Sequence, residues 1–181
     1  MKFKSTILIL PGLGNSENNH WQTLWERKFP QFIRVQQADW ETPKCDDWIS
    51  VIDHEISKHD PSNVIVVGHS LACATIVFWH QKFKRKLKGA LLVAPSDTEG
   101  SSYPKGTTGF TPMPLNQLPF PSIAVVSSND FYVTTERAKL FADAWGSEVV
   151  EIGNAGHINT DAGYGEWEEG LLILKKLDTY L

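Results

Sequence analysis

Short apolar runs alternate along the chain with longer segments in which apolar and polar residues are mixed. Between Trp48 and Ile56 apolar residues recur at positions 48, 49, 52 and 56, which is the spacing of one helix face. Buried strands that alternate with such helices are typical of a parallel sheet. The predicted strands are residues 6–10, 32–36, 63–67, 89–93, 122–127 and 148–152. The predicted helices are residues 20–28, 46–59, 70–82, 134–145 and 166–180.

This order of elements predicts an α/β fold, a three-layer α/β/α sandwich with helices on both faces of a mostly parallel six-stranded sheet. We expect residues 1–181 to form a single domain, because the sequence shows no internal repeat and no linker. Residues 96–121 interrupt the alternation, since they are rich in Gly, Ser, Thr and Pro. Long loops in compact domains are usually functional or disordered, and we interpret this one as a short cap-like loop.

The sequence Gly68-His69-Ser70-Leu71-Ala72 lies where the third predicted strand meets the third predicted helix. A serine on such a sharp turn is the nucleophile elbow of α/β-hydrolases, in which small flanking residues let strand and helix approach closely. Ala72 replaces a glycine of that motif, and its methyl group can still fit. A Gly-Ser turn between any strand and helix is the alternative interpretation.

A serine nucleophile needs a base, and the base needs a group that orients it. His157 lies in a glycine-containing loop after the last predicted strand, whereas the other histidines lie on helices, at a helix start or in the elbow. Asp130 follows the fifth predicted strand, at the edge where open α/β sheets assemble their sites. Taken singly, His157 could be a surface residue and Asp130 a helix cap. The chain order Ser70, Asp130, His157 is that of α/β-hydrolases, so we predict that these residues form a catalytic triad.

Acyl transfer also needs hydrogen-bond donors for the oxyanion. We predict an oxyanion hole formed by the backbone N–H groups of Leu71, directly after the nucleophile, and of Leu13, in the glycine-containing loop after the first strand. Gly14 is the next candidate in that loop, and an ordinary tight turn is the alternative. No cluster of His, Cys and carboxylate residues in the sequence suggests a metal site, and the mechanism requires no metal and no cofactor.

The chain resembles the small serine hydrolases of the retinoblastoma-binding protein 9 / YdeN family, within the α/β-hydrolase superfamily. The resemblance extends over nearly the whole chain and rests on residues 11–16, His20, Trp21, Trp25, Asp39, Trp40, Pro43, Trp48, residues 68–72, Asp130, residues 156–159 and Trp167. It implies a compact α/β-hydrolase fold with Ser70, Asp130 and His157 as the triad, and it leaves the substrate open.

The resemblance also suggests roles for residues outside the triad. Trp21, Trp25, Trp40 and Trp48 are expected to pack around the first loop, although one or two of them could border the site. Asp39 is interpreted as a structural hydrogen-bond acceptor, with an influence on the pocket as the alternative.

Four large apolar residues in the cap-like loop, Phe110, Met113, Leu115 and Phe120, have two possible roles. They could line an acyl pocket, or they could hold the loop against the core. We carry Phe110 and Phe120 forward as candidate substrate-binding residues.

Composition limits the partners and the compartment. A net charge of −4 and a pI near 5.8 give no basic footprint for nucleic acid. No apolar run approaches the roughly 20 residues of a membrane span, and the N-terminal run lacks the cleavage site of a signal peptide. Cys45 and Cys73 make no disulfide framework, so we expect a cytoplasmic location. The residues identify no protein partner.

Together these features predict a serine hydrolase that cleaves small carboxylic esters, since the predicted cap is short. A thioesterase, a peptidase or an acyltransferase would use the same residues. A non-enzymatic protein-binding member that retains the hydrolase scaffold is the alternative from another class, and the complete triad argues against it.

Overall fold

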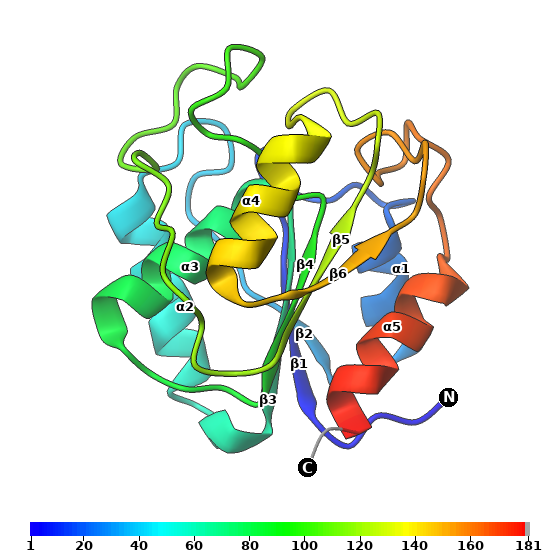
Figure 1. Cartoon of the computed structure of the whole chain (residues 1–181). Helices are drawn as coiled ribbons and strands as arrows, with labels where there is room; N and C mark the ends of the chain where they lie inside the picture. Colours follow the sequence, from blue (N-terminus) through cyan, green and yellow to red (C-terminus); the bar gives the residue numbers. More distant parts are fainter. Residues whose placement is uncertain (180–181) are drawn as a thin grey trace.

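The structure, a computed structural model, describes residues 1–179 and contains a central sheet covered by helices on both faces (Figure 1). The strands are β1 (Thr6–Leu10), β2 (Phe32–Arg34), β3 (Val64–His69), β4 (Gly89–Val93), β5 (Ser122–Val126) and β6 (Glu148–Glu151). The helices are α1 (Trp21–Lys28), α2 (Cys45–Ile56), α3 (Leu71–Phe83), α4 (Thr135–Trp145) and α5 (Glu168–Thr179). A 3-10 turn, η1 (Pro61–Asn63), precedes β3.

All five pairings in the six-stranded sheet are parallel, and the strand order is β2-β1-β3-β4-β5-β6. The chain moves outward from β1 to β2, then returns to the other side of β1 and continues from β3 to β6. The order therefore reverses between β1 and β3, and open α/β sheets bind ligands beside the carboxyl ends of the strands at such a point. The connections that leave these carboxyl ends gather at one edge of the sheet, away from the chain termini (Figure 1).

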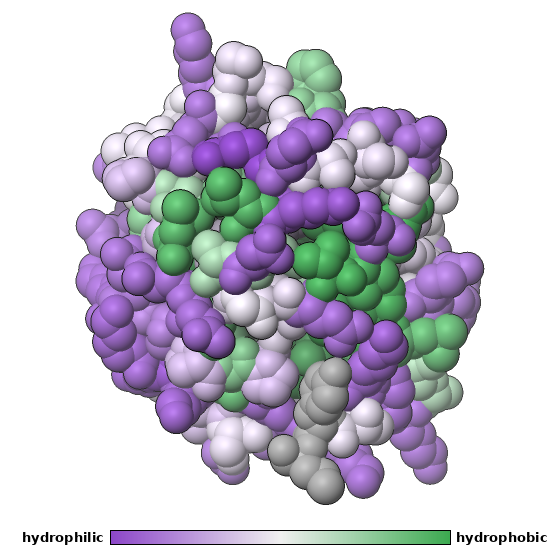
Figure 2. All heavy atoms as spheres, in the orientation of Figure 1, coloured by the Kyte–Doolittle hydropathy of each residue, from purple (hydrophilic) through white to green (hydrophobic). Residues whose placement is uncertain are grey.

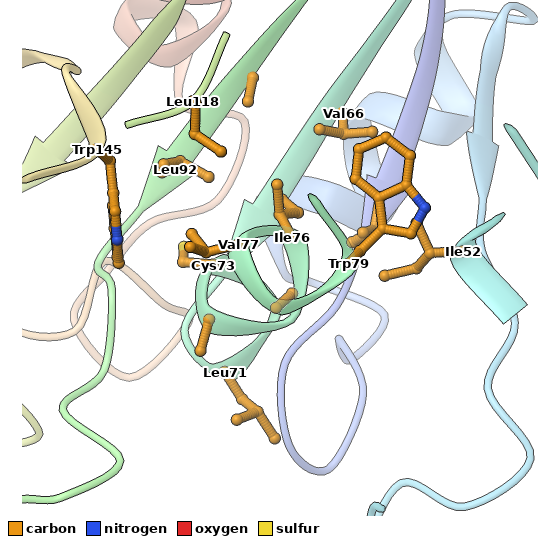
Figure 3. Close-up of a cluster of buried hydrophobic side chains, with 14 of the residues drawn as sticks. Ile52, Val66, Leu71, Cys73, Ile76, Val77, Trp79, Leu92, Leu118 and Trp145 are labelled. Atoms are coloured by element: carbon orange, nitrogen blue, oxygen red, sulfur yellow. The ribbon is translucent and has the colours of Figure 1, made fainter. Parts of the chain in front are cut away.

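Two apolar clusters hold the layers together. One lies between the sheet and α2, α3 and α4, and the other between the sheet and α1 and α5. Helix α3 is buried on most of its surface, because Cys73, Ile76, Val77 and Trp79 pack against the sheet and against α2 (Figure 3). A helix with so little polar surface is typical of a core position. Its N-terminus is thereby fixed against the carboxyl end of β3.

The predicted fold class is confirmed, and every predicted strand and helix is present. The boundaries differ by a few residues: β2 ends at Arg34 and α2 ends at Ile56, where Ser57 turns the chain. The sheet is entirely parallel rather than mostly so. The last predicted helix is confirmed as α5, and its predicted final residue, Tyr180, lies outside the described residues.

The face shown in Figure 2 is mainly hydrophilic, and its hydrophobic side chains form separate groups among polar ones. Within residues 1–179, no helix combines the length and the apolar character that a membrane crossing needs.

Candidate active site

Ser70 lies on a strained turn between β3 and α3. Its φ and ψ angles are 59° and −123°, a conformation that residues with a side chain rarely adopt. A Cβ at Gly68 would lie 2.7 Å from Ile76 Cδ1 and 3.1 Å from the backbone carbon of Ala72, so only glycine fits there. Ala72 is itself buried, and its methyl group is accommodated. The turn predicted from the motif is therefore present, and the Ser70 side chain is partly exposed at its tip.

The loop after β1 packs directly against this turn. A Cβ at Gly12 would lie 2.8 Å from both the His69 carbonyl oxygen and Ser70 Cβ, so a glycine is required for the contact. The Gly14 N–H donates to the Trp40 carbonyl at 2.9 Å, which removes Gly14 as an oxyanion donor. Within residues 1–179, the N–H groups of Leu13 and Leu71 donate no comparable loop or cap hydrogen bond. Leu71 is the first residue of α3, where backbone donors lack helical partners.

His157 and Asp130 are hydrogen bonded to each other. His157 Nδ1 lies 2.8 Å from Asp130 Oδ2 and 3.0 Å from Oδ1. The Asp130 side chain is fully buried, and that of His157 is 10% exposed. An ionised carboxylate only accepts, so Nδ1 carries the proton and Nε2 is left as the basic nitrogen. Asp130 also accepts from the Tyr132 N–H at 2.9 Å, which fixes the carboxylate in the loop that follows β5.

Two side-chain donors hold the loop that carries His157. His69 Nε2 lies 2.9 Å from the His157 carbonyl oxygen, and because a carbonyl only accepts, this nitrogen donates. The Trp21 indole N–H donates to the Ile158 carbonyl at 2.9 Å. Ile158 is fully buried at a φ of 49°, which is unfavourable for a β-branched residue. The strained loop is therefore held from α1 and from the elbow.

His20, His69 and His157 form a column of rings beside Ser70, with centroid distances of 4.9 Å between neighbours. Burial, together with the positive charge of Arg34 and the proximity of His157, lowers the pKa of His20 to about 4. Burial, together with His157 and His20, lowers the pKa of His69 well below its usual range. Both are therefore neutral at pH 7. The Nδ1 atom of His20 accepts from the Gln22 N–H and caps α1.

The Ser70 hydroxyl forms a hydrogen bond to the hydroxyl of Ser96, with an Oγ–Oγ distance of 2.8 Å. Ser96 is 1% exposed and follows the end of β4, the sheet neighbour of β3. Ser96 is not among the residues predicted from the sequence. Its place just after a buried strand, next to the strand that leads to the elbow, is a signal that could have identified it.

Ser70 and His157 line one cavity of about 260 Å³, and Asp130 lies behind the His157 ring. The β1 loop contributes Leu13 to the cavity wall. The cavity thus brings together Ser70, His157 and Leu13, whereas Leu71 does not line it. Within residues 1–179 the Ser70 hydroxyl is hydrogen bonded to Ser96 and not to His157. The further lining residues are Gly14, Asn15, Glu17, His20, His69, Ser96, Tyr103, Pro104, Tyr132, Asn159, Thr160 and Asp161.

The candidate substrate-binding residues Phe110 and Phe120 do not line this cavity, so their prediction is corrected. Phe110 is 2% exposed and packs edge-on against Trp48 and Phe78, with ring centroids 6.1 Å apart in each pair. Phe120 is also buried, with its ring against His80. These phenylalanines hold the 96–121 segment against the core.

The 96–121 segment nevertheless reaches the cavity, through Ser96, Tyr103 and Pro104. Of the other two apolar residues considered in this segment, Met113 is buried in the core and Leu115 is exposed. The segment therefore borders the site with its first residues and packs on the core with later ones.

Asp39 accepts hydrogen bonds from the backbone N–H groups of Glu41 and Thr42, each at 2.9 Å, and it does not line the cavity. This geometry agrees with a structural role in a turn. Among residues 1–179, no group of three or more His, Cys, Asp or Glu side chains is arranged to hold a metal ion.

Comparisons with known proteins find a matching family and structures with a similar fold. A sequence profile of the serine hydrolase family matches residues 7–176. The crystal structure of a YdeN-like hydrolase from Pectobacterium atrosepticum is similar at 34% identity and a TM-score of 0.84, over 96% of this chain and 90% of that chain. A search of curated protein sequences found no significant match.

Two more distant structures show the same fold. The ydeN gene product from B. subtilis is 18% identical with a TM-score of 0.76, over 98% of this chain and 100% of that chain. Esterase 2 of Thermogutta terrifontis is 15% identical with a TM-score of 0.67, over 97% of this chain and 82% of that chain.

Proposed function

The chain belongs to the serine hydrolase family, and we propose that it cleaves small carboxylic esters through an acyl-enzyme formed on Ser70. The observation that carries this proposal is the His157–Asp130 hydrogen bond at the wall of the cavity into which Ser70 projects. It provides an imidazole of defined tautomer beside a serine hydroxyl on a strained turn.

In the proposed first step, His157 Nε2 takes the proton of Ser70 while the Ser70 oxygen attacks the ester carbonyl carbon. Asp130 keeps the proton on Nδ1 and stabilises the imidazolium that forms. His157 then protonates the leaving alcohol. A water molecule, deprotonated in its turn by His157, attacks the acyl-enzyme and releases the acid.

The carbonyl oxygen becomes negatively charged in both steps and needs donors. The N–H groups of Leu13 and Leu71 are proposed for this role. Gly12 supports the assignment, because its close contact with Ser70 Cβ brings the β1 loop to the nucleophile. The commitment of the Gly14 N–H to Trp40 leaves Leu13 as the better donor in that loop.

The size and polarity of the cavity support a short, polar or weakly apolar substrate. A volume of about 260 Å³ lies below the range of roughly 300–1,000 Å³ that is usual for drug-sized ligands. Most of the lining side chains are polar, and the buried Thr160 hydroxyl has no hydrogen-bond partner within residues 1–179. The free, buried thiols of Cys45 and Cys73 support a reducing compartment such as the cytoplasm.

The proposal is tested by comparing hydrolysis of p-nitrophenyl acetate by the wild type and by Ser70→Ala. We expect the variant to lose roughly 10⁶-fold in kcat, as in enzymes whose serine nucleophile is removed. Circular dichroism checks that the variant is folded. Equal rates for the two proteins would contradict the proposed function and favour a binding role for the scaffold.

A further inference from the structure

Ser96 is buried against the proposed nucleophile, with its hydroxyl oxygen 2.8 Å from that of Ser70. We propose that Ser96 is a further catalytic residue, whose hydroxyl donates a hydrogen bond to the Ser70 oxygen and stabilises the negative charge that develops there during attack. This inference rests on the proposed acyl-enzyme function.

The backbone on both sides of Ser96 is anchored, which fixes the position of its hydroxyl. At the end of β4, the Val93 carbonyl accepts from the Ser70 N–H at 3.0 Å. Ala94 then turns the chain at a φ of 48°, and its N–H donates to the Val125 carbonyl at 2.9 Å. Positive φ values at residues with side chains cost energy and cluster at functional sites. The turn directs Ser96 toward the elbow.

The residue after Ser96 is held as firmly. The Asp97 N–H donates to the Tyr132 carbonyl at 3.0 Å, and the Asp97 carboxylate forms two hydrogen bonds with Arg137, at 2.8 and 3.0 Å. These contacts tie the start of the 96–121 segment to α4 and to the loop that carries Asp130. A donor held in this way needs no reorganisation as the reaction proceeds.

The partners available to the two hydroxyl groups indicate which of them donates in the Ser70–Ser96 hydrogen bond. If Ser70 donated to Ser96, the proton of Ser96 would have no acceptor among residues 1–179, although Ser96 is 1% exposed. A buried donor without a partner is costly. If Ser96 donates to Ser70, the proton of Ser70 is free to point toward His157. The second arrangement gives the buried Ser96 hydroxyl an acceptor and leaves the free proton on the partly exposed Ser70 hydroxyl, as the reaction requires.

Ser96 takes no part in the proton transfer of this step. The Ser70 O–H bond breaks, an N–H bond forms on His157, and the Ser70 oxygen bonds to the substrate carbonyl carbon. Ser96 keeps its proton throughout. As negative charge grows on the Ser70 oxygen, the hydrogen bond from Ser96 becomes charge-assisted and strengthens.

The chain offers a matched control for removal of this hydroxyl. Ser122 and Ser147 form a second hydroxyl pair with an Oγ–Oγ distance of 2.7 Å, and Ser122 is also buried. Ser122 starts β5, at the opposite end of the strand from Asp130. Ser122→Ala therefore breaks the same kind of bond away from the site.

The experiment measures, for wild type, Ser96→Ala and Ser122→Ala, the rate constant for labelling by a fluorophosphonate and kcat/KM for p-nitrophenyl acetate between pH 5 and 9. For Ser96→Ala we expect both rates to fall roughly tenfold to a hundredfold, the effect of one hydrogen bond to a charged oxygen. The midpoint of the pH profile should stay in place, because His157 and Asp130 are unchanged. Ser122→Ala should remain within about twofold of the wild type, since its pair is remote.

A Ser96→Ala protein that reacts as fast as the wild type, or faster, would overturn the role of Ser96; a faster rate would mean that Ser96 restrains the nucleophile. An equal fall in Ser122→Ala would also overturn it, because the effect would then be general. A wild type that is neither labelled nor active contradicts the proposed function itself.

Discussion

Ser70 stands where three segments meet, and the residues beside it are small because there is no space for larger ones. Gly68 permits the close approach of α3 to β3, and Gly12 permits the contact between the β1 loop and the elbow. The backbone at Ser70 is strained, because its φ is positive. Single methyl groups at these glycines should therefore affect the site more than their size suggests.

Gly12→Ala tests this closeness. A methyl group 2.8 Å from Ser70 Cβ and the His69 carbonyl must displace the β1 loop, and with it the Leu13 N–H. Loss of one oxyanion donor typically lowers kcat roughly 10²–10³-fold. We expect kcat of Gly12→Ala for p-nitrophenyl acetate to fall by a factor approaching this range. Gly165→Ala is the control, because its nearest atom, Leu24 Cδ1, lies 4.0 Å away. Unchanged kcat in Gly12→Ala would refute an oxyanion donor in this loop.

His20 gives the fold a defined sensitivity to acid. Its pKa is about 4 in the folded chain and 6.5 when unperturbed. Between these values the unfolded chain binds a proton that the folded chain does not, so the free energy of unfolding falls as the pH drops from 6.5 toward 4. From pH 7 to pH 4.5 the loss from this group is about 2 kcal/mol.

Asn at position 20 keeps a side-chain acceptor for the capped N–H of Gln22 but does not titrate. Urea unfolding of the wild type and of His20→Asn, each at pH 7 and at pH 4.5, measures how much stability each protein loses in acid. We expect the acid-induced loss to be smaller in the variant by about 2 kcal/mol. Identical losses in the two proteins would show that His20 does not resist protonation.

The elements of the fold could be predicted because their patterns are local. Strands such as β1 and β4 are short apolar runs, and both appear with the predicted boundaries. Ser70, Asp130 and His157 each stand next to such an element, so the parallel topology brought them to one edge.

The lining of the cavity was less accessible to sequence reasoning, because it depends on contacts between distant loops. The direction of the chain at Ser96 is set by the strained Ala94 and by the pairing of Asp97 with Arg137, and neither leaves a pattern in the sequence. For Phe110, both interpretations were compatible with an apolar residue in a loop. Its ring contacts with Trp48 and Phe78 show that it packs in the core.

Helix α1 holds two loops through two equivalent indole hydrogen bonds. Trp21 donates to Ile158 and Trp25 to the Glu166 carbonyl, each at 2.9 Å, and both rings are fully buried. Only the first bond restrains the loop that carries His157. Trp21→Phe should therefore lower kcat, by roughly threefold to tenfold for one neutral hydrogen bond, with KM nearly unchanged.

Trp25→Phe is the matched control and should lose similar stability without the fall in kcat. Steady-state kinetics and thermal unfolding of both variants make the comparison. Parallel losses of kcat would mean that α1 acts on the site only through general stability.

At the scale of the molecule, the sheet order places the candidate site at the reversal between β1 and β3, and we expect the charges around it to disfavour anionic substrates. Glu17 and Asp161 are exposed at the cavity, and none of the Lys or Arg residues among residues 1–179 lines it. The whole chain also carries a net charge of −4. An anionic substrate would approach against this field.

We expect p-nitrophenyl butyrate to be cleaved faster than p-nitrophenyl hemisuccinate, which has a similar length and carries a carboxylate. The substrate carboxylate would lie several ångströms from an acidic side chain in a solvated site. Repulsion between these two charges corresponds to a kcat/KM that is roughly fivefold higher for the butyrate than for the hemisuccinate. The ratio should shrink in 0.5 M salt, a condition of roughly 4 Å Debye length, and in the Glu17→Gln/Asp161→Asn double variant. A preference for the hemisuccinate would contradict the assignment of charge at the cavity.

The central claim is that Ser70 becomes covalently acylated, and the most direct measurement is the location of a covalent adduct. The wild-type protein is treated with a fluorophosphonate, digested and analysed by peptide mass spectrometry. We expect one equivalent of the phosphonyl group, attached to Ser70 in the peptide that joins β3 to α3. An adduct on another residue, or no adduct on folded protein, would contradict the account.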